Sequence, residues 1–343
     1  MRKWLIAAFG VLILNIPVQT AAAEEEVPLE IEPVYPENQE TGTKGYFSLA
    51  MDPGEEQTVN FRMTNNLDEE VTLSAEPANA YTHPKGGILY NPSVDSPNTR
   101  LLDDAVSMKE YLSLDETVTL EPGASEEVPV SVEAPDVEGQ TALGAVVFTT
   151  EVSEQEADGS GGNEEANIVL NTETSYKLAV QVNLPNESTP DFSVGEAGFL
   201  TETGQVFIEM TNNAHLIQGD ILGDYIVTDS EDEEVFSGEL AEFNMAPKSN
   251  IRYQIPWNNE SLDDGDYTLT LNGSAGDDNF SVEEDFTIAQ DDIEEYAEVN
   301  TPEVNEPDGF SMPIWVWILA AALFGGLMLV LGKKLNRPQA KEE

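Results

Sequence analysis

The sequence contains no cysteine and only two histidines, His83 and His215. Without cysteine the chain has no disulfide, no thiol nucleophile and no thiolate metal ligand, and two histidines exclude a metal site built from several imidazoles. A G-x-S-x-G nucleophile motif is also absent. We therefore predict a protein that is not an enzyme and that uses no cofactor and no metal.

Acidic loops are the remaining candidates for a cation site. They lie at residues 229–234, 263–266 and 277–278. None has the D-x-D-x-D-G spacing with a distal glutamate that a calcium loop requires. Solvated acidic loops are the simpler interpretation, and calcium binding stays open.

Long apolar runs are rare, and the longest lies near the C-terminus. Residues 314–332 (IWVWILAAALFGGLMLVLG) carry no charge. As a helix they span roughly 28 Å, close to the hydrocarbon core of a bilayer. Lys333, Lys334 and Arg337 follow directly, the pattern expected on the cytoplasmic side. The alternative, a buried core helix, seldom ends in such a cluster, so we predict one membrane-spanning helix and a cytoplasmic tail, residues 333–343.

The N-terminus carries an export signal. Arg2 and Lys3 precede a mostly apolar stretch at residues 4–16, and three alanines at 21–23 precede three glutamates. This pattern predicts a cleaved signal peptide over residues 1–23, with an uncleaved signal anchor as the alternative. The mature chain is then a single-pass type I membrane protein with an extracellular ectodomain.

Positive charge is scarce. The chain has 14 Lys and Arg against 66 Asp and Glu, a net charge of −52. The predicted signal peptide and tail hold six of the basic residues and two of the acids, which leaves eight basic and 64 acidic residues between them. Such a surface repels nucleic acid and anionic membranes, so we predict no nucleic-acid partner. It suits a saline or alkaline habitat, or basic partners.

Amphipathic helical patterns are missing before the anchor; the nearest stretch, residues 101–112, is long enough for a turn or two. Apolar residues instead alternate with polar ones, which predicts half-buried antiparallel strands. The first half has such strands at 57–64, 127–133 and 176–184, and a more continuously apolar central strand at 143–149. The second half has seven, at 192–200, 206–211, 221–228, 234–240, 251–257, 267–272 and 280–288.

These patterns predict an all-β chain of two tandem immunoglobulin-like β-sandwich domains, followed by a stalk and the C-terminal transmembrane helix. Proline turns at residues 52–54, 121–123 and 246–248 each lead into an alternating strand. The predicted parts are a lead-in at 24–33, a first sandwich at 34–184 with an acidic loop at 153–167, a joint at 185–190, a second sandwich at 190–289 and an acidic coil-like stalk at 290–313.

Short motifs follow one another in a specific order. In the first sandwich they lie at residues 35–39 (YPENQ), 45–49 (GYFSL), 53–54, 64–66, 79–82 (NAYT), 86–90 (GGILY) and 143–145. In the second they lie at 213–220 (NAHLIQGD), 244–249 (NMAPKS), 255–257 and 262–267. Together they resemble the WxL-interacting proteins of Gram-positive bacteria, with a DUF916-like first domain and a DUF3324-like second domain whose family boundary starts near residue 168.

The resemblance implies a membrane-anchored scaffold or adhesin within and beyond the cell wall. It implies that the first domain binds peptidoglycan, that the second binds host extracellular matrix or surface proteins, and that the chain associates with secreted WxL-domain proteins. The acidic loop and the strong negative charge depart from this picture and leave open whether a host ligand exists.

Candidate ligand-binding residues are the tyrosines of the N-terminal motifs, because sugars and peptide stems pack on exposed aromatic faces. They are Tyr35, Tyr46, Tyr81 and Tyr90, with core or rim packing as the alternative. Candidate partner-binding residues are His215, Leu216 and Gln218, which lie in a segment too polar for a plain strand. The alternative there is a structural turn with Gly219 at positive φ.

A second function is also compatible with sandwiches, since an open sheet edge accepts an added strand. The chain would then be a strand-accepting assembly chaperone or sensor for secreted surface proteins. The edges predicted for this role are near residues 176–184 and 206–211.

Overall fold

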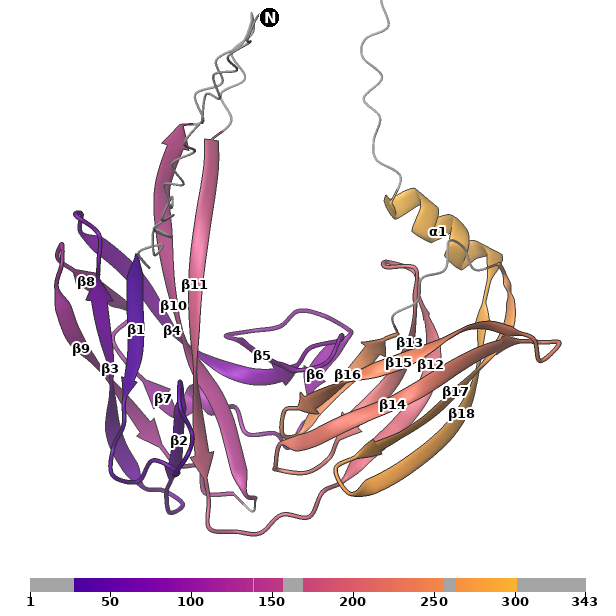
Figure 1. Ribbon diagram of the computed structural model, residues 1–343, viewed down its shortest axis with the longest axis horizontal. Helices are drawn as coiled ribbons and strands as arrows, with labels where there is room; N and C mark the ends of the chain where they lie inside the picture. The colour runs from indigo at the N-terminus through magenta and orange to yellow at the C-terminus, as the bar shows by residue number, and fades with distance from the viewer. Residues whose placement is uncertain (1–27, 138, 157–168, 256–262, 301–343) are drawn as a thin grey trace, which may run out of the picture. The chain divides into compact units, whose positions relative to one another are not determined.

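The computed structural model describes residues 28–137, 139–156, 169–255 and 263–300 (Figure 1). The predicted signal peptide, membrane span and tail lie outside these residues. Within the described part, no helix has both the length and the apolar character needed to cross a membrane.

The first sandwich packs two sheets against each other. One has the strand order β1 (Leu29–Val34), β3 (Glu56–Asn65), β9 (Ser125–Glu133) and β7 (Leu112–Ser113). The other has the order β2 (Phe47–Ala50), β11 (Val169–Asn183), β10 (Thr141–Glu156), β4 (Val71–Thr82) and β5 (Ile88–Asn91), with β8 (Thr117–Leu120) also paired to β4. The 3-10 turn η1 (Met108–Glu110) buries Met108 and is the short helical piece that residues 101–112 allowed.

Alternation along the strands places one side-chain row in the core between these sheets. Phe61 packs between Phe47 and Phe148: its ring is tilted against Phe47, with centroids 5.0 Å apart, and meets Phe148 edge to face, with centroids 5.7 Å apart. All three rings are fully buried. Successive residues of a strand point to opposite faces. The residues that alternate with the buried ones along each strand therefore point away from the core and are available for binding.

The second sandwich has its own core. One sheet has the order β12 (Phe192–Leu200), β13 (Gln205–Asn212), β16 (Ser249–Gln254) and β6 (Thr99–Leu101). The other has the order β15 (Glu234–Met245), β14 (Gln218–Asp229), β17 (Gly265–Ala275) and β18 (Asp278–Ile288). All seven strands predicted for the second half are present, and the all-β prediction with two hydrophobic cores is confirmed.

Strand β6 crosses from one half of the chain to the other. It lies between β5 and η1 in the sequence, yet it pairs antiparallel with β16 in the second sandwich, Arg100 opposite Asn250. Both sandwiches belong to one compact unit that ends at Ile293. The second sandwich is therefore completed by a strand from the first half, which no local pattern in the sequence predicts.

Three predicted boundaries are wrong. The predicted lead-in contains β1, because Leu29 and Ile31 pack into the first core. The predicted acidic loop starts too early, since β10 runs to Glu156 and pairs there with β11. The predicted coil of the stalk begins with a helix, α1 (Gln290–Asn300), whose first turn is supported by Asp292 accepting a hydrogen bond from the Ala289 N–H at 2.8 Å.

Of the two strands predicted to have an open edge, one is paired on both sides and the other is partly unpaired in the described part of the chain. Residues 206–211 lie in β13, which has β12 on one side and β16 on the other, so this prediction is wrong. In β11 only Val180–Asn183 are covered by β2. Among the described residues no strand flanks that side of β11 from Thr174 to Ala179.

Candidate functional site

Two of the four candidate tyrosines belong to opposite edges of the six-stranded sheet. Tyr46 immediately precedes β2, and Tyr90 lies on β5, at the other edge. Burial, and to a lesser extent the Tyr46 phenol, raise the pKa of Tyr90 to about 12.

The surface beneath Tyr90 is made of small side chains. Ala145 on β10 lies opposite Ala179 on β11 and opposite Ala78 on β4. Ala78 and Ala145 are fully buried, and Tyr90 packs on them together with Val147. Because a methyl group projects so little, these alanines leave room for the Tyr90 ring above the sheet.

Polar side chains border this surface on β11 and β2. The Gln181 side-chain amide donates to Asn183 Oδ1 at 2.7 Å, and the Asn183 amide donates to Ser48 Oγ at 2.9 Å. Further along β11, Lys177 Nζ donates to Asn91 Oδ1 at 3.3 Å. We call Tyr46, Tyr90, Lys177, Gln181 and Asn183 the tyrosine face.

The sequence predicted only the two tyrosines of this face. Gln181, Asn183 and Lys177 are the outward residues of the predicted strand at 176–184, where alternation alone indicates a solvated face. One signal was available in the sequence, because Lys177 is one of only eight basic residues outside the predicted signal peptide and tail.

The other two tyrosines have structural contacts. The Tyr35 hydroxyl accepts a hydrogen bond from the Gly45 N–H at 2.6 Å, and its ring meets Phe47 edge-on. Tyr35 remains 43% exposed, whereas Tyr81 on β4 is 9% exposed. Tyr81 therefore has no free ring face, and Tyr35 anchors the loop before β2.

The candidate partner segment contacts the first sandwich. The His215 carbonyl accepts hydrogen bonds from the N–H groups of Gln140 and Thr141 at 3.0 and 2.9 Å. Burial, and then the positive charge of Lys248, lower the pKa of His215, while Asp104 opposes the shift. A Cβ on Gly139 would collide with the His215 side chain. His215 therefore lies where the two sandwiches contact each other.

Leu216 and Gln218 also have local roles. The Leu216 carbonyl accepts a hydrogen bond from the Asn212 side chain at 2.8 Å. Gln218 is buried and donates to the Gly219 carbonyl at 3.1 Å. The left-handed residue of this turn is Asp220, with φ of 52°, and not Gly219. The prediction placed positive φ one residue too early, because Asp also tolerates this region when its backbone is hydrogen-bonded.

A buried network of hydroxyl groups connects the two sandwiches. The Thr82 and Ser249 hydroxyls are 2.6 Å apart, Ser249 donates to the Ala246 carbonyl at 2.7 Å, and the Ala246 N–H donates to Thr82 Oγ1 at 2.9 Å. At the surface, Lys248 Nζ lies 2.6 Å from Asp104 and lowers the pKa of that carboxyl. The segment at residues 244–249 thus holds the two halves together.

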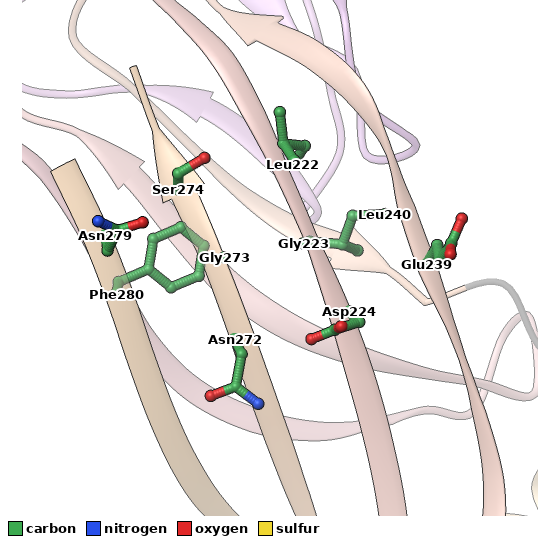
Figure 2. Close-up of a pocket in the computed structure, with 10 residues that line it drawn as sticks. All are labelled: Leu222, Gly223, Asp224, Glu239, Leu240, Asn272, Gly273, Ser274, Asn279 and Phe280. Atoms are coloured by element: carbon green, nitrogen blue, oxygen red, sulfur yellow. The ribbon is translucent and has the colours of Figure 1, made fainter. Parts of the chain in front are cut away.

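A second surface feature lies on the second sandwich. A depression of about 650 Å3 crosses β15, β14, β17 and β18, with Gly223 and Gly273 opposite each other at its centre (Figure 2). A Cβ on either glycine would collide with a carbonyl oxygen of the facing strand. Around the glycines Figure 2 shows Phe280, Asp224 and Asn272.

Apolar side chains beside this depression are unusually exposed. Leu222 and Ile226 on β14 are 42% and 41% exposed, and they flank Asp224 in the strand. We call Leu222, Asp224, Ile226 and Glu239 the β14 face. An apolar pair among carboxylates suits a partner that brings apolar and basic groups together.

Two sandwiches with an aromatic and amide-lined face define a surface binding protein. Comparison with family models agrees: residues 29–150 match the "WxL Interacting Protein, peptidoglycan binding domain" and residues 165–298 match the "WxL Interacting Protein, host binding domain". The chain belongs to the WxL-interacting protein family. The matched regions are separated within the β10–β11 hairpin, so β11 falls in the second match although it pairs in the first sandwich.

The solved structures that resemble the chain are distant. The class 5 fimbriae chaperone CfaA is 14% identical, covers 74% of this chain and 99% of its own, and has a TM-score of 0.30. The E. coli chaperone DraB is 12% identical, with 76% and 95% covered and a TM-score of 0.29. A CsuC–CsuE complex from Acinetobacter baumannii is 9% identical, with 75% and 98% covered and a TM-score of 0.33. These values carry no inference about binding. A search of curated protein sequences gave no match.

Proposed function

We propose that this protein is a membrane-anchored scaffold of the cell surface that binds peptidoglycan through the tyrosine face. The observation that carries the proposal is the packing of Tyr90 on Ala78 and Ala145, on a sheet that also carries the hydrogen-bonded amides of Gln181 and Asn183. Sugar rings pack their C–H faces on aromatic rings, and side-chain amides both donate to and accept from hydroxyl and acetamido groups.

Lys177 adds a positive charge that would attract the carboxylates of peptidoglycan. Stem peptides carry carboxylates, and a strongly acidic chain would repel them unless a cation lies beside the binding face. Lys177 is exposed and contacts the neutral Asn91. The tyrosine face therefore offers stacking, hydrogen bonds and one positive charge, which match the sugar, the acetamido group and the peptide stem.

Sedimentation with purified, insoluble peptidoglycan tests this assignment. The Tyr46→Ala and Gln181→Ala variants of the full chain should each bind about tenfold more weakly, the effect of losing roughly 1.4 kcal/mol. Gln205→Ala, which changes the same amide type on β13, should bind like the parent chain. If Gln205→Ala weakens binding as much as Gln181→Ala, or if neither tyrosine-face variant changes it, the tyrosine face is not the site.

The second sandwich is proposed to bind proteins through the β14 face. The exposed Leu222 and Ile226 supply apolar contact, and Asp224 and Glu239 select a basic partner surface. Secreted WxL-domain proteins and host matrix components are the proposed partners. Leu222→Asp should abolish capture of a secreted WxL-domain protein, whereas Thr119→Asp on the first sandwich should not. Equal capture by both variants would exclude the β14 face.

The proposed location follows from the ends of the sequence. A signal peptide at residues 1–23 and a span at 314–332 would leave the sandwiches outside the membrane and the basic tail inside. Protease added to intact cells whose wall has been removed should digest the sandwiches and leave a small membrane-bound fragment. Protection of the whole chain would reject this orientation.

A further inference from the structure

The edge of the first sandwich has a gap in one sheet. Strand β2 pairs in parallel with β11 only from Val180 to Asn183. Before β2 the chain passes through two left-handed glycines, Gly42 and Gly45, and the Gly45 N–H is tied to Tyr35. The residues before β2 therefore do not form a strand beside the rest of β11. From Thr174 to Ala179, no described strand pairs with this side of β11.

A cleft lies beside the gap. It has a volume of about 240 Å3, and Thr174 and Tyr176 of β11 line it together with Leu29 of β1 and Val71 of β4. These residues belong to both sheets, so the cleft reaches between them at the border of the first core, where Tyr176 and Val71 pack. An extended strand beside β11 would direct alternate side chains toward this space.

The mouth of the cleft is acidic. Glu69 and Glu70 line it, and Glu30 and Glu32 are exposed on the adjacent β1. Lys177 lies within this stretch of β11, but on the opposite face from Thr174 and Tyr176, where it donates to Asn91 Oδ1 at 3.3 Å. Arg62 on β3 lies opposite Glu32 and is bridged to Glu127 at 2.9 Å. On the cleft side of β11, an incoming segment thus meets carboxylates next to an apolar space.

We propose that this edge accepts an extended segment of a partner protein in which apolar and basic residues alternate. Backbone hydrogen bonds to β11 between Thr174 and Ala179 supply affinity, the apolar side chain fills the cleft, and its basic neighbours face Glu69 and Glu70. This site shares Lys177 with the tyrosine face, but its cleft lies on the opposite face of β11, beside Thr174 and Tyr176. It assigns the chain a second activity, the capture of an unpaired strand.

Hydrogen exchange on the full chain tests the proposal with defined probes, a short peptide in which Val and Lys alternate and a second in which Val and Glu alternate. The Val-Lys peptide should slow exchange at residues 174–179, and the Val-Glu peptide should not. The double variant Glu69→Lys, Glu70→Lys should bind the Val-Lys peptide on the order of tenfold more weakly. The matched double variant Glu231→Lys, Glu283→Lys has the same charge change on the second sandwich and should bind like the parent.

Several outcomes would overturn the proposal. Unchanged exchange at 174–179 with either peptide would exclude strand acceptance, and equal protection by both peptides would exclude a basic partner. Protection that rises with protein concentration in the absence of peptide would identify a second copy as the occupant. Protection at all concentrations without peptide would mean that the chain's own residues cover the edge.

Discussion

The hydroxyl oxygens of Thr82 and Ser249 lie 2.6 Å apart in a fully buried position, although the two residues are 167 positions apart in the sequence. Thr82 ends β4 of the first sandwich, and Ser249 begins β16 of the second. A buried hydroxyl pair costs free energy unless both members are satisfied, so this pair specifies one way of joining the sandwiches.

Ser249→Ala should destabilise the whole chain. The substitution removes the Ser249 donor to the Ala246 carbonyl and leaves the buried Thr82 hydroxyl proton without its acceptor, at a cost of about 1–3 kcal/mol. Urea unfolding followed by tryptophan fluorescence and circular dichroism measures the change. Thr119→Ala, which removes an exposed hydroxyl that bonds Thr72, should change the free energy of unfolding by no more than about 0.5 kcal/mol. Equal losses in both variants would contradict a special role for the Thr82 and Ser249 pair.

Fragments cut at the family boundary should be less ordered than the intact chain. A fragment of residues 165–298 carries β11 without β10, β2 or the first core, and it lacks β6, which pairs with β16. We expect fast amide exchange in β11 and faster exchange in β16 than in the intact chain. Exchange in β17, whose partners β14 and β18 are both retained, is the internal control. Native-like protection of β11 in the fragment would contradict this pairing.

The raised pKa of Tyr90 predicts how the stability of the folded chain changes at alkaline pH. Burial and Tyr46 raise the pKa of Tyr90 from 10.0 to about 12, so the folded chain favours the neutral phenol. The contribution to stability is complete below pH 10 and is lost as the pH rises toward about 12, because the unfolded chain releases the proton first. The slope of unfolding free energy against pH in this window should become shallower in Tyr90→Phe. Thr119→Ala, which removes an exposed hydroxyl that does not titrate, should keep the parent slope. An unchanged slope in Tyr90→Phe would show that another group titrates.

Gly144→Ala should be costly although it adds a single methyl group. A Cβ there would lie 2.7 Å from Met108 Cγ and 2.8 Å from the Ala78 carbonyl oxygen, so β4 or η1 must shift. We expect a loss of about 1–3 kcal/mol in a thermal or urea unfolding experiment. Gly219→Ala is a suitable control, since its Cβ would meet only Asn244 Oδ1, at 3.4 Å. A loss for Gly219→Ala equal to that for Gly144→Ala would argue against the steric explanation.

Periodicity predicted all seven strands of the second half, but in the first half it predicted only β3, β9, β10 and β11 and missed β4. It succeeds where the pattern is local: Phe61 faces the first core and its neighbours Asn60 and Arg62 are polar, an alternation that survives whatever lies on the next strand. Even the Pro-Gly turn at residues 53–54 follows from local chemistry, with Gly54 at φ of 75°.

The boundaries of the elements were harder to predict where an acidic composition indicated a coil and the segment forms a strand or a helix. Leu29 and Ile31 are flanked by acids, so composition suggested a lead-in, yet two apolar residues at a spacing of two are enough for an edge strand. Five of the eleven residues of helix α1 are acidic, and its few apolar residues, among them Ile293, Tyr296 and Ala297, make too short a pattern to predict a helix from the sequence.

The sequence by itself determined the all-β class and the two cores, and it supplied the tyrosines among which the binding candidates lie; the export and anchor signals remain predictions. Each of these depends on residues close together in the chain. Only the tertiary structure decided that Tyr90 packs on Ala78 and Ala145, that His215 contacts the first sandwich, and that among the described residues part of β11 has an unpaired edge. Those outcomes depend on which strands become neighbours, and strand order is set by the packing of distant segments, as β6 beside β16 illustrates.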